Sequence, residues 1–68
     1  MKFDFLKLMD KKIKLIDDVG HIFIGVADGY EDPENSEDGL WYLNVDVPDF
    51  GLLNISEPEI KSIEVLNG

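Results

Sequence analysis

The chain has 68 residues, which is enough for one small domain spanning 1–68 and too few for a two-domain enzyme. Hydrophobic residues make up 44% of the sequence, which argues against disorder, and cysteine is absent, which excludes disulfides and thiolate zinc sites. Fifteen acidic residues against six lysines give a net charge of −9, which argues against a broad phosphate-binding surface and so against DNA as a partner.

The charge is unevenly distributed along the chain. Five of the six lysines lie within residues 1–14, whereas residues 15–68 contain thirteen acidic residues and only Lys61. A lysine-rich first strand beside solubilising acidic residues explains this pattern most simply. The N-terminal stretch is interrupted by charges and so does not resemble a signal peptide, and no run of about 20 apolar residues is present. A cytoplasmic protein with no membrane partner is therefore expected.

Residues 3–9 are too densely apolar for a strand. Phe3, Phe5, Leu6, Leu8 and Met9 fall within these seven residues, and Leu6 and Met9 would share one face of a helix. The sequence therefore predicts a short N-terminal helix or turn.

A β-hairpin follows, because the apolar period changes to two from residue 12 onward. Ile13 and Leu15 alternate with lysines, and the turn residues 17–20 (DDVG) come next. The second strand alternates two sets of side chains, with Ile22, Ile24 and Val26 on one face and His21, Phe23 and Gly25 on the other. Both faces carry bulky groups, so one is expected to fill the core and the other to cover the helix or a neighbouring subunit.

Three further strands are predicted after the polar segment 31–39. The first of them places Trp41, Leu43, Val45 and Val47 on one face. Turn residues at 48–51 and 56–59 separate it from two strands that end near residues 55 and 65. Five short strands suit an all-β fold, a small and strongly bent SH3-like barrel, in which the interior Gly25 marks a bend.

The segment 31–39 (EDPENSEDG) contains five acidic residues in nine. Calcium prefers several oxygen ligands, but the EF-hand spacing fails, because counting from Asp32 places Glu37 where the turn glycine belongs. A solvated acidic loop is the expected structure, with neither a metal nor another cofactor.

Two motifs resemble those of the Sm-like (LSm) family over nearly the whole chain. The stretch GHIFIGVADGYED has that family's glycine, glycine and glycine-aromatic spacing at Gly20, Gly25, Gly29 and Tyr30, with Glu31 in place of the usual aspartate. The stretch ISEPEIKSI has the second motif's isoleucines at Ile55, Ile60 and Ile63, with Ser56 and Glu57 in place of arginine and glycine. The resemblance implies a five-stranded Sm-like barrel with a short N-terminal helix.

The resemblance also indicates where single-stranded, uridine-rich RNA would bind. In RNA-binding members a base stacks between an aromatic residue or histidine and the arginine of the second motif, and an asparagine two residues after the aromatic contacts the base edge. Two placements compete: Asn35 takes the asparagine position with Pro33 as the stacking residue, or Tyr42 and Asn44 take both positions. The second is preferred because it keeps the strand's alternation, and the arginine is missing in either.

No catalytic arrangement is recognisable, so the chain is not expected to be an enzyme. It has one histidine, His21, and its serines lack an activating partner in the sequence. We expect a non-catalytic Sm-like interaction module that forms a homo-oligomer and binds RNA through Tyr42, Asn44 and Asn35. The alternative is an acidic SH3-like barrel that binds a protein partner and no RNA.

Overall fold

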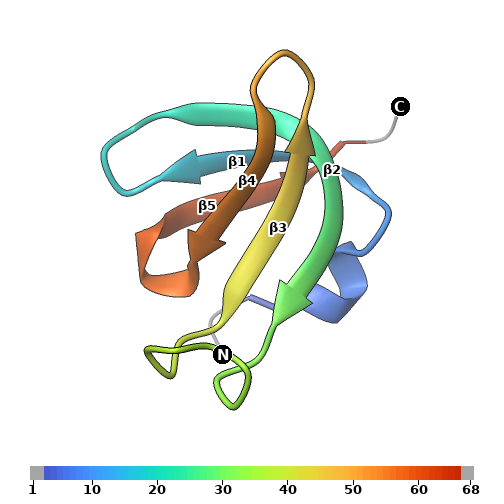
Figure 1. Ribbon diagram of the computed structural model, residues 1–68. Helices are drawn as coiled ribbons and strands as arrows, with labels where there is room; N and C mark the ends of the chain where they lie inside the picture. Colours follow the sequence, from blue (N-terminus) through green and yellow to red (C-terminus); the bar gives the residue numbers. More distant parts are fainter. Residues whose placement is uncertain (1–2, 67–68) are drawn as a thin grey trace.

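The computed structural model describes residues 3–66, which form five strands and two short 3-10 turns (Figure 1). In chain order the elements are η1 (Phe5–Leu8), β1 (Lys12–Asp17), β2 (Ile22–Glu31), β3 (Tyr42–Val47), β4 (Gly51–Ser56), η2 (Glu57–Glu59) and β5 (Ile60–Val65). The five predicted strands and the all-β class are confirmed. The expected N-terminal helix is a single 3-10 turn of four residues, because the backbone leaves the helical conformation at Met9, with its ψ of 134°, and Asp10 follows with a φ of 64°.

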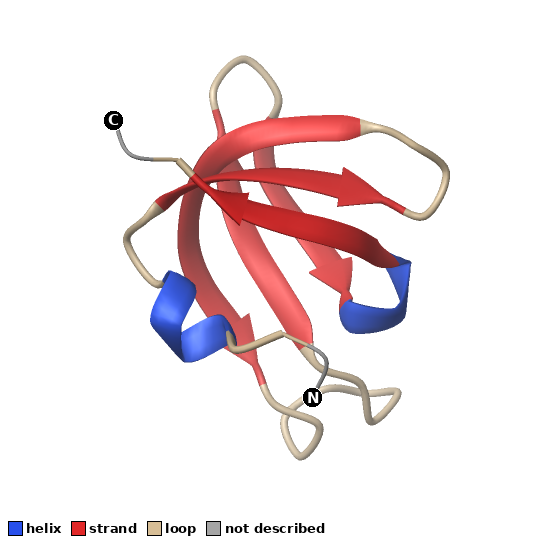
Figure 2. Cartoon of the chain, turned by 180° about the vertical axis from the view of Figure 1, so that it is seen from behind, coloured by secondary structure: helices blue, strands red, loops and turns tan. Residues whose placement is uncertain are grey.

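The strands form one antiparallel sheet in the order β4-β3-β2-β1-β5. The sheet curls, so that β1 and β5 lie across β3 and β4 (Figure 2). In this order β4 and β5 are the two outer strands and are not hydrogen-bonded neighbours of each other. The expected barrel is therefore corrected to a strongly bent sheet that is not closed.

Strand β2 produces the bend because it pairs with different strands along its length. Its first half pairs with β1, from Ile22 to Val26, and its second half pairs with β3, from Val26 to Glu31. A Cβ atom at Gly25 would lie 2.2 Å from the backbone oxygen of Asp46, so only glycine fits this approach. A register shift between Ala27 and Gly29 adds further twist.

The core lies on the concave side of the sheet. Its buried members come from every strand and from η1: Phe5, Leu8, Ile13, Leu15, Ala27, Leu43, Val45, Val47, Ile55 and Ile60. The predicted alternation in β1 and β3 is thus confirmed. In β2 the inward face carries Gly25, Ala27 and the half-buried Phe23, whereas the opposite face is exposed. Trp41 is only half-buried and packs edge-on against Phe5 at a centroid distance of 6.3 Å.

The turn between β1 and β2 is held by one carboxylate. Asp17 Oδ1 accepts hydrogen bonds from the backbone N–H groups of Val19 (3.1 Å) and His21 (2.8 Å), and its Oδ2 lies 3.1 Å from His21 Nδ1. Gly20 has a φ of +94°, which favours glycine. His21 is exposed in this turn.

We predict that Gly25→Ala destabilises the fold by about 1–3 kcal/mol, the usual cost of overpacking, because the new methyl group would overlap the β3 backbone. Gly29→Ala is the matched control on the same strand, since its Cβ would meet only the Asn44 amide nitrogen at 3.6 Å. We expect the control to stay within about 0.5 kcal/mol of the wild type. Urea denaturation followed by circular dichroism measures both, and equal effects would contradict the role given to Gly25.

Candidate functional site

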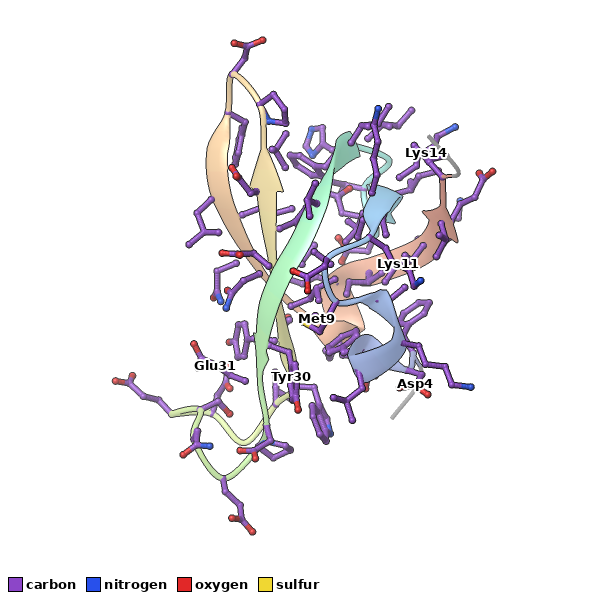
Figure 3. The ribbon with its side chains drawn as sticks, turned by 90° about the vertical axis from the view of Figure 1, so that its right-hand side faces the viewer. Asp4, Met9, Lys11, Lys14, Tyr30 and Glu31 are labelled. Carbon is purple, nitrogen blue, oxygen red and sulfur yellow. The ribbon has the colours of Figure 1, made fainter. Side chains whose placement is uncertain are left out.

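An open hollow of about 430 Å³ lies where the loop between β2 and β3 meets the outer side of the sheet. We call it the loop hollow. Its lining residues come from the end of β2, the loop, β3 and β4: Glu31, Asn35, Ser36, Glu37, Asp38, Tyr42 and Asn54. Figure 3 shows Glu31 at the end of β2 that leads into this loop. The loop hollow thus contains two of the three residues expected to contact RNA, Tyr42 and Asn35.

The loop that borders the hollow is organised by its own hydrogen bonds. Asp32 Oδ1 accepts from the backbone N–H (3.0 Å) and the side-chain amide (2.9 Å) of Asn35. Ser36 Oγ donates to the carbonyl oxygen of Leu40 at 2.8 Å. The acidic segment is therefore a folded loop, and its Asn35 amide is held in place.

Tyr42 forms one wall of the loop hollow, and its position is fixed by Asp38. The Tyr42 hydroxyl donates a hydrogen bond to the Asp38 carboxylate. This hydrogen bond lowers the pKa of Asp38 below its usual value of 3.8, and a bond from the backbone N–H of Leu40 adds to the effect. The same hydrogen bond raises the pKa of Tyr42 above its usual value of 10.0. The contact therefore favours a charged Asp38 and a neutral Tyr42.

Asn44 is linked to the loop hollow through a neighbour on β4. Asn44 and Asn54 are directly opposite each other, and Asn54 Nδ2 donates to Asn44 Oδ1 at 2.6 Å. Asn54 itself lines the hollow, so Asn44 lies next to it rather than in it. Sequence reasoning missed Asn54, because the pairing of β3 with β4 that brings it here is a tertiary feature.

The position of the missing arginine is occupied by a residue with a structural role. Ser56 lies directly opposite Tyr42 in the β3–β4 ladder, is 4% exposed, and donates a hydrogen bond of 2.5 Å to Glu59 Oε1. Ser56 therefore supports η2 and offers no cation beside the Tyr42 ring. The lining of the hollow contains three acidic residues, Glu31, Glu37 and Asp38, and no lysine.

Other kinds of site were sought among residues 3–66. In that part of the chain no three histidine or acidic side chains are grouped so that they could hold a metal ion. The same residues include no helix with the length and apolar character needed to cross a membrane. No protein-family model matches the chain, and no similar curated protein or solved structure is found.

The hydrogen bond between Tyr42 and Asp38 should make the stability of the fold depend on pH, once in the acidic range and once in the basic range. A depressed carboxyl pKa stabilises the fold above the unfolded value of 3.8 and loses this effect as the pH falls through the lower folded value. A raised phenol pKa contributes below the unfolded value of 10.0 and loses its effect as the pH rises through the higher folded value. Tyr42→Phe should therefore return the Asp38 pKa toward 3.8, as measured by carboxyl carbon NMR. Tyr30→Phe, the control, should leave the Asp38 pKa unchanged, and an unchanged pKa in Tyr42→Phe would show that the hydrogen bond is not formed in solution.

Proposed function

We propose that this chain is a non-catalytic interaction module of the Sm-like type that assembles into a homo-oligomer through the edges of its sheet. The observation that carries this proposal is the strand order, in which β4 and β5 remain outer strands of a bent sheet. Outer strands present backbone N–H and C=O groups that a neighbouring strand can pair with. Pairing of β4 in one copy with β5 in the next is a head-to-tail contact, which can close into a ring.

The ligand that we propose for the loop hollow is a basic segment of a protein partner. Three carboxylates line the hollow and would repel a phosphate group, whereas they attract an arginine or lysine side chain. Arginine suits the lining particularly well, because its guanidinium stacks on aromatic rings and binds carboxylates with two hydrogen bonds. Tyr42 supplies the ring, and Glu31 and Glu37 supply carboxylates.

Single-stranded RNA is the second candidate, and the grouping of amides around Tyr42 favours it. A base could stack on the Tyr42 ring while the amides of Asn35 and Asn54 contact its edge. The phosphates of such a strand would have to stay away from the acidic lining. Asn44 would contribute by orienting Asn54 through their 2.6 Å hydrogen bond.

Binding of two labelled probes distinguishes the two candidates. We expect an arginine-rich peptide to bind at low salt, measured by fluorescence anisotropy, and a uridine-rich RNA not to bind. Glu37→Gln should weaken peptide binding by removing one charge, while Glu64→Gln on β5 is the matched control away from the hollow. RNA binding that Tyr42→Ala weakens by about 1–3 kcal/mol, the usual contribution of one stacked base, would favour RNA instead. Failure of both probes to bind would remove the hollow as a ligand site.

Assembly through the strand edges should strengthen with added salt. Each copy carries a net charge of −9, so the copies repel one another until salt screens that charge. Light scattering in low and high sodium chloride should therefore show the mass rising with salt, while an uncharged osmolyte at matched osmolality serves as the control. A monomer under both salt conditions, at concentrations of several milligrams per millilitre, would contradict assembly.

A further inference from the structure

A stripe of exposed aliphatic side chains follows the outer face of β2. Ile22, Ile24 and Val26 are 58%, 45% and 41% exposed. Alternate residues of a strand point to the same side, so the three side chains form one row, which we call the β2 stripe. In an antiparallel sheet with one face on the core, the other face usually carries polar residues. The β2 stripe is an apolar exception in the middle of the sheet.

Opposite charges border the β2 stripe on its two sides. Val26 is paired with Lys12 on β1 and with Asp46 on β3, and both of these residues are exposed. Neighbouring strands lie about 4.8 Å apart, so Lys12 and Asp46 are separated by roughly 10 Å with Val26 between them. The next lysine, Lys14, pairs with Ile24 on one side and Glu64 on the other, so an acidic neighbour already accompanies it. Figure 3 shows Lys14 toward the end of the sheet opposite the acidic loop.

The row through Val26 extends symmetrically beyond the two charges. Asp46 is paired with Leu52 on β4, which is 61% exposed. On the other side, the backbone N–H of Leu66 donates to the carbonyl oxygen of Lys12 at 2.8 Å, so Leu66 lies beside Lys12. The order across the sheet is leucine, aspartate, valine, lysine and leucine. Read from either end, the row has a leucine, a charged residue and the central valine. The charged residue is acidic on one side of the valine and basic on the other.

We propose that a second copy of this chain binds the β2 stripe face to face, in a two-fold dimer whose axis runs parallel to β2. Such an axis places each stripe on its own counterpart and brings the β1 side of one copy over the β3 side of the other. Lys12 of each copy then faces Asp46 of its partner, which gives two equivalent ion pairs at the border of an apolar contact. Two sheets packed face to face in this way stand about 10 Å apart.

A second copy offers an opposite charge to both Lys12 and Asp46 at the borders of the stripe. A partner that carries charge of only one sign can pair with only one of them. An acidic partner segment would match Lys12 but face Asp46 with a like charge, and a basic segment would do the reverse. The chain is also short, and small domains gain most from covering apolar surface. The contact uses the outer face of β1, β2 and β3, so it leaves the outer edges of β4 and β5 open and is independent of assembly through them.

Charge reversal tests the proposal, because the two single variants should complement each other. In a dimer of Lys12→Glu, the new glutamate of each copy would face Asp46 of its partner, and in a dimer of Asp46→Lys, the new lysine would face Lys12. Both contacts are repulsive, so each variant should have half the wild-type mass in sedimentation equilibrium. In an equimolar mixture both contacts become attractive. The glutamate introduced in one variant meets the lysine introduced in the other, and the native Asp46 of the first meets the native Lys12 of the second. The mixture should therefore regain the wild-type mass, and so should the chain that carries both substitutions.

Two controls carry the same changes of net charge away from the stripe. Lys7→Glu in η1 and Asp18→Lys in the first turn should keep the wild-type mass. Circular dichroism shows whether each variant is folded, and recovery in the mixture is not expected of a variant that is merely unfolded. Single variants with the wild-type mass, controls that lose mass equally, a mixture that stays at half mass, or a wild-type chain that is monomeric would each overturn the proposed dimer.

Discussion

The close approach of β2 to β3 at Gly25 is the contact on which the rest of the structure depends. The backbone oxygen of Asp46 occupies the place where a Cβ atom of residue 25 would lie. Because Gly25 has no Cβ, β2 can leave β1 and continue along β3 as one unbroken strand. The resulting bend gives the five-stranded sheet one enclosed face, which a flat sheet of this size could not provide. Val26, the residue paired on both sides at the bend, is also the centre of the exposed row on the opposite face.

Alternation of apolar residues was sufficient to predict the strands, because burial on one side of a sheet imposes a period of two. Leu43, Val45 and Val47 face the core as that period requires. The orientation of β2 could not be predicted in the same way, since both of its faces carry large apolar groups. The structure resolves it through Gly25 and Ala27, which are small enough to face the crowded interior and leave the isoleucines outside.

The open form of the sheet and the details of the hollow depend on contacts between distant residues, which a local pattern does not contain. Trp41 reads as a core residue by alternation, but it precedes β3 and is only half-buried. The sequence indicated Tyr42, Asn44 and Asn35, but the carboxylate that holds the tyrosine and the β4 amide beside Asn44 are set by loop folding and strand register. Ser56 is a further example of what the sequence does not show. The motif shows only that a serine stands in place of arginine, whereas the structure shows that this serine donates a hydrogen bond to Glu59.

The strand order has a consequence for the way the protein is made. Strands β1 to β4 each pair with the strand next to them in the chain, whereas β5 pairs only with β1, so that Ile63 meets Leu15 and Val65 meets Ile13. During synthesis from the N-terminus, the edge of β1 that pairs with β5 therefore stays without its partner strand until all four later strands have emerged from the ribosome. An unpaired strand edge is a template for aggregation, and charged side chains, lysine above all, are a common protection against it. Strand β1 carries two such lysines, Lys12 and Lys14, next to the edge that waits for β5.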